Sequence, residues 1–478
     1  MHHYLLLRLF VLVSISISIS ISACSAAEVN FETDRGAKAD DDSLDTAWAN
    51  GKILNETLAS LKPGDKLVVP NKTFTLMGGI ISANLTSVVI SIDGTLSFTD
   101  KDIKGWPTSD GKNVLHCLDF IFPRNVTFTA KGKGTLEGNG AKWWGIPGIG
   151  YLERGENRPR LMQIDSGTDI LVENLFFHNS PYWTFWADSA QNLEIRFSDI
   201  VAKRSADADT HNVYEMSAFN TDGFDVSGDN VWIHDVNVWN QDDSICAKDG
   251  STNMVFERIN ASGVGLTIGS IGDSTNDNIT FRDIRMHHTE KGVYMKFRGN
   301  GIISNVVYEN IYMDAPEQWA IWIGPAQQSD SGDLCAAHPC SICWPEAPSA
   351  KCTPTKGQYI NITLRNFTVN NAKQSPGVIL SDPSTPMKGL VFDNVVFNNP
   401  GYEPWDEMHW KCEGAGDAVA TGTTWPVPPC FEDKTIGSAK YAAAAARKKS
   451  AHGQANFSLS AQVRARMAAG ATSAFLDF

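Results

Sequence analysis

Residues 230–238 read NVWIHDVNV, and the same pattern returns as NMVFERINA at 253–261, NITFRDIRM at 278–286 and NVVYENIYM at 305–313. Each segment begins with asparagine and places apolar residues three and six positions later, and the steps between segments are 23, 25 and 27 residues. Related segments occur as DILVENLFF at 169–177, NITLRNFTV at 361–369 and GLVFDNVVF at 389–397. The chain therefore repeats one short unit along much of its length.

The repeat predicts the fold. Apolar and polar residues alternate with period two inside each unit, which indicates a strand, and Gly, Asn and Asp between units indicate turns. One unit cannot bury its own apolar face, so successive units must stack. The leucine pattern of leucine-rich repeats is missing, and a propeller needs a longer period. We expect an all-β fold, a single-stranded right-handed parallel β-helix, with an N-terminal capping helix at Asp42–Leu61 and Asp42 or Ser43 as its N-cap.

Composition limits the partners. The 478 residues carry a formal net charge of -14, which argues against nucleic acid and anionic membranes as partners. The same charge means that a polyanionic substrate would need local cations at its binding site.

The two ends of the chain differ from the repeat. Arg8, the apolar run that follows it and the small residues of ACSAA predict a signal peptide over residues 1–26. The alternative, a membrane anchor, is disfavoured because the run is short and polar residues follow directly. We expect a catalytic β-helix domain at 27–434, an alanine-rich and flexible tail at 435–478, and a secreted protein of the extracellular space or cell wall.

Cysteines and glycosylation sequons agree with secretion. The crowded Cys335, Cys340, Cys343 and Cys352 predict two loop disulfides rather than a zinc site, because secreted proteins are oxidised. Cys412 and Cys430 are a third expected pair, and Cys117 and Cys246 have the apolar context of buried thiols. Sequons that predict a glycoprotein lie at Asn55, Asn71, Asn84, Asn125, Asn260, Asn278, Asn361, Asn366 and Asn456.

Carboxylates gather at residues 220–244, NTDGFDVSGDNVWIHDVNVWNQDDS. Asp222 and Asp242 are 20 residues apart, about one coil, so stacked coils would bring Asp222, Asp242 and Asp243 together. We expect Val264 and Lys296 to continue this column on the same outer face.

The remaining aspartates of the stretch have less clear roles. Asp229 and Asp235 belong to turns and repeat units, which predicts structural or solvated side chains, and Asp225 stays ambiguous. Clustered carboxylates raise one another's pKa, so one can stay protonated while another is ionised, as glycoside hydrolysis requires. A calcium site or plain turn aspartates are the alternatives.

Six motifs resemble glycoside hydrolase family 28, the polygalacturonases and related pectin hydrolases. They lie between about Phe31 and Pro400 and read GAKADDDSLDTAWANG at 36–51, HNSPYWTFW at 178–186, NTDGFD at 220–225, NQDDS at 240–244, SGVGLTIGSIG at 262–272 and GVYMKFRGNG at 292–301. The pair NTDGFD and NQDDS is the specific part of the resemblance.

The resemblance implies roles for these positions. Asp242 would be the general acid, while Asp222 and Asp243 would hold and activate water, with inversion of configuration and without a metal or another cofactor. Lys296 would meet a substrate carboxylate, and Asn220, Tyr294 and Arg298 are further candidates for substrate binding. Stacking at one strand spacing, taken alone, favours a retaining arrangement, but a third carboxylate gives water a second anchor.

Two positions depart from the family pattern. Val264 stands where the family has histidine, and valine neither titrates nor donates a hydrogen bond. Tyr294 stands where the family has arginine, which removes a bidentate partner for a uronate. Arg298 could compensate, as could His287 or His288. The aromatic residues Tyr182, Trp183, Trp186, Trp319 and Trp322 could stack on sugars or simply pack against the solenoid.

The sequence thus predicts a monomeric, polygalacturonase-like glycoside hydrolase that cleaves an acidic cell-wall polysaccharide, polygalacturonate or a related pectic polymer. A polysaccharide lyase is one alternative and would need a basic residue and usually calcium. A catalytically weakened or inactive polysaccharide-binding homologue is the other, motivated by the loss of the family His and Arg.

Overall fold

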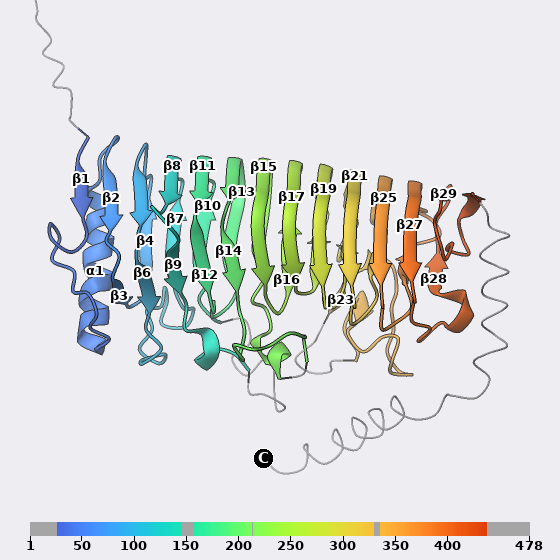
Figure 1. Cartoon of the computed structure of the whole chain (residues 1–478), viewed down its shortest axis with the longest axis horizontal. Helices are drawn as coiled ribbons and strands as arrows, with labels where there is room; N and C mark the ends of the chain where they lie inside the picture. Colours follow the sequence, from blue (N-terminus) through green and yellow to red (C-terminus); the bar gives the residue numbers. More distant parts are fainter. Residues whose placement is uncertain (1–25, 146–156, 213, 329–334, 437–478) are drawn as a thin grey trace, which may run out of the picture.

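Strands from Glu28 to Thr435 wind as successive coils of a parallel β-helix, which runs from β1 (Glu28–Asn30) to β30 (Glu432–Thr435) (Figure 1). The computed structural model describes residues 26–145, 157–212, 214–328 and 335–436. Within these ranges each strand of the large sheet pairs in parallel with the strand one coil further along. The expected fold class is confirmed, whereas residues 1–25 of the expected signal peptide and 437–478 of the expected tail lie outside the described residues.

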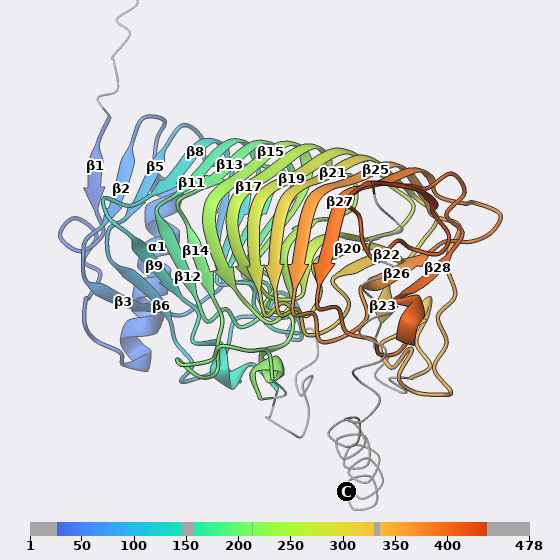
Figure 2. The same cartoon turned by 45° about the vertical axis from the view of Figure 1, so that its right-hand side comes forward.

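Three rows of strands form the sides of the solenoid (Figure 2). The first row contains β4 (Ile80–Ala83), β7 (Leu118–Ile121), β10 (Met162–Asp165), the starts of β13 (Phe185–Arg196) and β15 (Phe224–Trp239), then β16 (Asp243–Ala247), β18 (Gly265–Ile271), β20 (Val293–Phe297), β22 (Ile321–Pro325), β26 (Gly377–Leu380) and β28 (Trp410–Glu413). The second contains β1, β2 (Lys66–Val69), β5 (Val89–Ile92), β8 (Arg124–Thr129), β11 (Thr168–Glu173), later parts of β13 and β15, β17 (Thr252–Ser262), β19 (Thr275–His287), β21 (Ile302–Asp314), β25 (Gln358–Asn370), β27 (Lys388–Asn398), β29 (Val419–Gly422) and β30. The third contains β3 (Thr73–Leu76), β6 (Thr95–Phe98), β9 (Gly134–Glu137), β12 (Leu175–His178) and β14 (Asp199–Val201), which joins the end of β15.

The core is a set of inward-facing columns inside the coils. In the first row Phe224, Ile245, Leu266, Val293 and Ile321 follow one another in register, and each is fully buried. Burying one such side chain contributes about 1.5–3 kcal/mol, so each coil is stabilised mainly by its neighbours. Because side chains alternate along a strand, the residues between these core positions must point outward.

Asparagine at the start of each repeat has a structural cause. Asn230, Asn253, Asn278, Asn305 and Asn361 all have φ between 53° and 57°, the left-handed region in which asparagine is tolerated. Their side chains also bond from coil to coil. Asn278 Nδ2 donates to Asn253 Oδ1 at 2.7 Å, and Asn253 Nδ2 donates to Asp229 Oδ1 at 2.7 Å.

The same asparagine ladders account for some of the sequons. Four sequon residues donate their Nδ2 atom to an asparagine of the coil before, namely Asn260, Asn278, Asn361 and Asn366. An N-glycan would be attached at this same atom. Glycosylation stays a prediction, and these four sequons have a second explanation in the turn asparagine followed by strand-forming threonine or serine.

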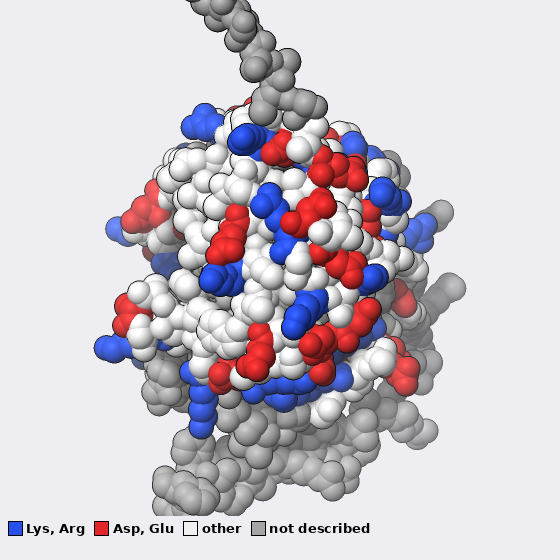
Figure 3. Space-filling view, turned by 90° about the vertical axis from the view of Figure 1, so that its left-hand side faces the viewer, with Lys and Arg blue, Asp and Glu red and all other residues white. Residues whose placement is uncertain are grey.

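The N-terminal end of the solenoid is capped by α1 (Leu44–Ser60). Ser43 is its N-cap and accepts a hydrogen bond from Thr46 N, so one of the two expected N-cap residues is confirmed. Leu54 and Leu58 are buried against the first coils. Acidic and basic side chains intermix over this end (Figure 3), with surface ion pairs such as Lys72–Glu32 at 2.7 Å, as expected for a capped solenoid.

The disulfide expectations are also confirmed. Cys335 pairs with Cys343, Cys340 with Cys352, and Cys412 with Cys430, whereas Cys117 and Cys246 are buried free thiols. The first two bonds lie in the insertion between β22 and β25, which also carries β24 (Cys340–Ser341), paired with β23 (Gln327–Gln328). No helix in the described ranges is long and apolar enough to cross a membrane.

The asparagine ladder gives a stability prediction. Asn253→Ala should destabilise the protein by about 2 kcal/mol, because alanine is strained at positive φ and the ladder bonds are lost. Asn253→Gly should cost less, because glycine loses the bonds but accepts the φ angle. Thermal melting should therefore rank wild type above the Gly variant and the Gly variant above the Ala variant. An Ala variant that melts at the wild-type midpoint would contradict this account.

Candidate active site

The coil brings the predicted carboxylates into one cluster. Asp222 precedes β15 and Asp243 begins β16, and Gly223 N donates to Asp243 O at 2.8 Å across the two coils. One side-chain oxygen each from Asp222, Asp242 and Asp243 lies within 4.8 Å of the others. All three side chains are at least nine-tenths buried. The expected meeting of these residues on one outer face is therefore observed.

Lysines neutralise this cluster. Lys296 Nζ lies 2.9 Å from Asp243 Oδ2, and Thr267 Oγ1 donates to Asp243 Oδ1 at 2.6 Å. Lys248 Nζ lies 3.0 Å from Asp225 Oδ2 and 3.5 Å from Asp222 Oδ2. Asp225, ambiguous in the sequence, is thus a fully buried member of the cluster. Without these cations, so many buried carboxylates could not ionise.

The surroundings separate the pKa values of adjacent carboxyl groups. Burial and the charges of Asp222 and Asp243 raise the pKa of Asp242 well above its usual range. Burial acts in the same direction on Asp243, but Lys296 and Lys248 outweigh it and hold the pKa of Asp243 below its usual value. One carboxyl group therefore retains a proton beside one that is ionised, as acid–base hydrolysis requires.

The two other carboxyl groups of the cluster also bind protons more tightly. Burial, followed by the charge of Asp225, raises the pKa of Asp222 well above its usual range against the opposing effect of Lys248. Burial raises the pKa of Asp225 to about 6. Because these groups interact, their protons belong to the cluster as a whole.

Asn220 lies beside Asp242. Its Nδ2 atom donates to Asp242 Oδ2 at 3.3 Å, and its Oδ1 atom accepts from Arg158 Nη2 at 3.0 Å. The other oxygen of Asp242 accepts from Asp243 N at 2.8 Å. Asn220 thus orients the Asp242 carboxyl group in this structure, while its expected contact with substrate stays a prediction.

The predicted column needs one correction. Lys296 was expected to follow Val264 in the row of Asp222 and Asp243, but Lys291 occupies that place, because Lys291 N donates to Val264 O at 2.8 Å. Lys296 pairs in register with Gly269, further along the strand, and reaches Asp243 through its long side chain. The turn between β19 and β20 is shorter than the sequence spacing implied.

The other predicted residues lie at the edge of the cluster. Tyr294 is buried, and its ring centroid is 4.2 Å from Lys296 Nζ. Val264 and Tyr294 pack in an apolar cluster with Trp319, Trp322, Cys340, Val378 and Leu380, which the insertion covers through Trp344. Trp319 and Trp322 therefore belong to an apolar wall beside the aspartate cluster. Arg298 donates to the side chain of Gln328.

Asp229 and Asp235 lie outside the cluster, as expected. Asp229 accepts from Thr252 at 2.6 Å and Asn253 at 2.7 Å. Asp235 pairs with Arg258 at 2.9 Å, and hydrogen bonds from Arg258 lower the pKa of Asp235 to about 2. Both side chains therefore stabilise the contact between neighbouring coils.

With this geometry in place, the comparison with known proteins is decisive. The model of the family described as "Glycosyl hydrolases family 28" matches residues 62–415, well over half of the chain. The chain belongs to this family. The expected assignment as a glycoside hydrolase is confirmed.

Several known proteins and solved structures are similar to this chain. "Probable rhamnogalacturonase C" of Aspergillus flavus is 26% identical over 398 residues, which cover 81% of this chain and 76% of the relative. "Probable rhamnogalacturonase E" of Aspergillus niger is 29% identical over 79% of this chain and 75% of the relative. The exopolygalacturonase of Thermotoga maritima aligns with a TM-score of 0.61 at 18% identity, over 86% of this chain and 92% of that one. Endo-xylogalacturonan hydrolase of Aspergillus tubingensis aligns with a TM-score of 0.56 at 19% identity, over 86% and 99%. These structural likenesses show the same fold.

Sequence reasoning missed three side chains of the site. Lys248 and Thr267 point outward from β16–β18 toward the aspartates, and Lys291 lies in their row. Lys248 lies three residues after the inward Ile245, and Thr267 lies one residue after the inward Leu266. Alternation counted from these two core positions would therefore have placed both side chains outward. Placing Lys291 in this row would have required the length of the turn before β20.

Lys296 gives a pH prediction. Because Lys296 lowers the pKa of Asp243, Lys296→Met should raise that pKa and leave Asp243 ionised only at higher pH. The acidic limb of the kcat/KM profile should then move upward by about one to three pH units, the usual effect of a close opposite charge. Lys434→Met, which removes an exposed lysine paired with Glu432, is the matched control and should leave the profile in place. An acidic limb that does not move in the Lys296 variant would show that Asp243 is not the titrating base.

Proposed function

We propose that this chain is a secreted, monomeric hydrolase of an acidic pectic polysaccharide, working by inverting acid–base hydrolysis with Asp242, Asp222 and Asp243. The observation that carries the proposal is the buried cluster of three aspartates, in which Lys296 pairs with Asp243 and the amide of Asn220 contacts Asp242. Burial and neighbouring charges shift the pKa of Asp242 upward and that of Asp243 downward. A binding protein has no need to hold like charges together in a buried cluster.

Each step of the reaction has a residue. Asp242 donates its proton to the glycosidic oxygen as the bond to the anomeric carbon breaks. A water held between Asp222 and Asp243 attacks that carbon from the opposite face and passes a proton to Asp243. Lys296 and Thr267 keep Asp243 ionised and oriented, because each contacts one of its oxygens. Lys248 offsets the charge on the Asp222 side.

The separation of the carboxylates bears on the stereochemistry. Their nearest oxygens lie within 4.8 Å, which for a pair of carboxylates would favour retention. Three carboxylates, however, allow two of them to hold the water while the third serves as the acid, and the family resemblance favours inversion. The same three oxygens could approach a cation, but Lys296 and Lys248 already supply positive charge, so the proposal includes no metal.

The names of the relatives and the wall of the site narrow the choice of substrate. Relatives of this chain are named as probable rhamnogalacturonases. Tyr294 and Val264 are buried in the aromatic and apolar wall beside the aspartates, where the family has arginine and histidine. A backbone in which uronate alternates with a deoxysugar suits such a wall, so rhamnogalacturonan is the first candidate and polygalacturonate the second. Lys296 has three N–H donors and can still meet a substrate carboxylate besides Asp243.

A panel of pectic polysaccharides tests the proposal against its alternatives. The secreted protein should release new reducing ends from rhamnogalacturonan, and fewer or none from fully methyl-esterified pectin. A lyase would instead generate an unsaturated product that absorbs ultraviolet light. Binding without any new reducing ends would identify an inactive homologue and contradict the proposal.

The acid role predicts a severe loss on Asp242→Asn. Removing the proton donor should reduce kcat by at least about 10²-fold, the typical contribution of general acid catalysis. Asp235→Asn is the matched control from the same stretch, because Asp235 pairs with Arg258 outside the cluster. Turnover should be measured on the best substrate of the panel, with melting curves to confirm folding. A folded Asp242→Asn variant that keeps more than about a tenth of wild-type turnover would rule out the role.

A further inference from the structure

A hollow of about 300 Å³ lies on the N-terminal side of the aspartates. Its lining comes from the ends of loops that lead into the first row of strands, namely Asn113, Val114, His116, Asn157, Arg158, Arg160 and Tyr182. None of the family motifs read from the sequence includes Arg160, and the proposed hydrolysis does not use it.

Backbone hydrogen bonds place Arg160 in the row of the catalytic residues. Leu161 N donates to Trp183 O at 3.1 Å, and Thr184 N donates to Asp222 O at 2.8 Å. Arg160, Trp183 and Asp222 therefore occupy equivalent outward positions in consecutive coils. Two strand spacings separate Arg160 from Asp222, roughly 10 Å along the face. A polysaccharide bound at Asp222 and running along this face would reach the hollow.

The Arg160 guanidinium is held in place without an ion-pair partner among the described residues. It lies over the ring of Trp183 at 4.4 Å and near that of Trp186 at 5.6 Å, and it donates to the side chain of Gln163. Its Nε atom is buried without a hydrogen-bond partner in the described part of the chain, where no carboxylate lies within salt-bridge distance of it. Asp119, Asp165, Asp222 and Asp225 act on it only at longer range.

Neighbouring cations are held by ion pairs or by several hydrogen bonds to protein oxygens. Lys296 pairs with Asp243, and Lys248 pairs with Asp225. Arg158, beside Arg160, uses its guanidinium to bond Phe219 O, Pro181 O and Asn220 Oδ1. A largely buried guanidinium without such a partner is costly unless a ligand supplies the anion. Arginine also presents the planar donor pair that matches a carboxylate.

We propose that Arg160 and the hollow beside it bind the carboxylate of an acidic sugar of the substrate, on the N-terminal side of the catalytic aspartates. The inference rests on the proposed function. It adds a residue that recognises the negative charge of the polysaccharide at a distance from the cleaved bond. Trp183 is the positioning residue, because Arg160 lies over its ring and Lys248 Nζ lies 4.9 Å from the same ring. Local binding of this kind is what a protein of net charge -14 needs for an acidic polymer.

Binding to an inactivated protein tests the inference without depending on turnover. In the Asp242→Asn background, calorimetry would compare an acidic rhamnogalacturonan oligosaccharide with its carboxyl-methylated form. Adding Arg160→Gln should weaken binding of the acidic form about ten- to a hundredfold, the value of one charge-assisted hydrogen bond, and should change binding of the esterified form little. Arg160→Lys should recover part of the affinity.

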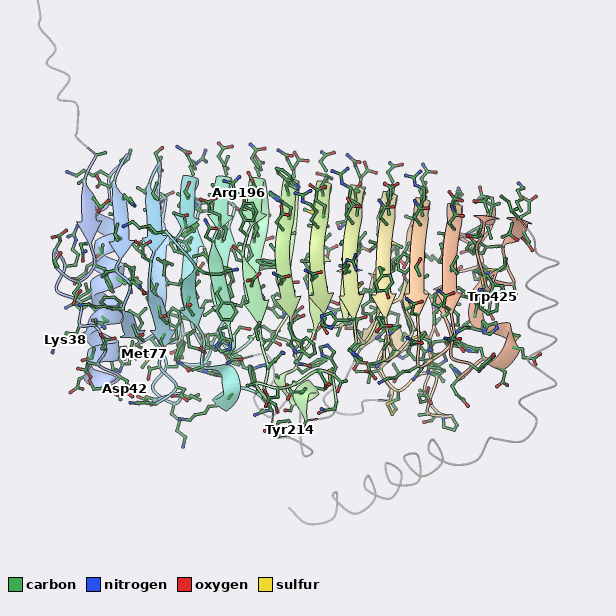
Figure 4. All side chains as sticks on the ribbon, viewed as in Figure 1. Lys38, Asp42, Met77, Arg196, Tyr214 and Trp425 are labelled. Atoms are coloured by element: carbon green, nitrogen blue, oxygen red, sulfur yellow. A yellow bond between two sulfur atoms is a disulfide. The ribbon has the colours of Figure 1, made fainter. Side chains whose placement is uncertain are left out.

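Arg196→Gln is the matched control. Arg196 pairs with Glu173 and Glu194. Figure 4 shows it in the upper part of the solenoid, away from Tyr214 at the lower edge, whose loop leads into Asp222. Melting curves exclude misfolding. Unchanged affinity on Arg160→Gln, or equal weakening for both forms of the oligosaccharide, would overturn the inference. Acid-selective binding through Arg160 in a wild-type chain that releases no reducing ends would uphold it while contradicting the proposed hydrolysis.

Discussion

Stacking of coils in register is the constraint on which the rest of the structure depends. A strand spacing of about 4.8 Å fixes every outward residue next to its equivalents one coil before and after. Fully buried inward columns such as Phe224, Ile245 and Leu266 hold that register. Asp222 and Asp243 consequently become neighbours whether or not their charges favour it. The surrounding side chains then determine which of these closely spaced carboxyl groups ionises.

The surrounding side chains act differently on Asp242 and Asp243, and this difference separates the pKa values of the two carboxyl groups. Lys296 and Thr267 contact Asp243, so it ionises readily, whereas Asp242 is left with the amide of Asn220 and a backbone N–H as its partners. Burial and the charges of Asp222 and Asp243 therefore raise the pKa of Asp242, and Lys296, which pairs with Asp243, opposes the rise only in part. The aromatic and apolar wall around Tyr294 further excludes water beside the cluster. The fold thus holds two carboxyl groups with separated pKa values side by side, the pair that the proposed mechanism uses as acid and base.

The sequence predicted the solenoid because its signals are local and repeated. Asparagine at each turn and alternating apolar residues carry the fold, and the spacing of Asp222 and Asp243 brings the carboxylates together. The cations were harder to place. Lys291 occupies the position expected for Lys296 because turn lengths differ between coils. No sequence motif indicates that Arg160 has no ion-pair partner among the described residues. The covering of Trp322 by the disulfide-bonded insertion depends on tertiary packing that spacing does not encode.

The central claim is that three clustered aspartates hydrolyse a glycosidic bond by direct attack of water. Proton NMR during the first minutes of hydrolysis tests it most directly, because the anomeric signal of the new reducing end is recorded before it equilibrates. The account predicts that the first product anomer has the configuration opposite to that of the cleaved bond. A first product that retains the configuration would mean that one aspartate acts as a nucleophile, as the short separation of the carboxylates alone would have implied, and would contradict the account.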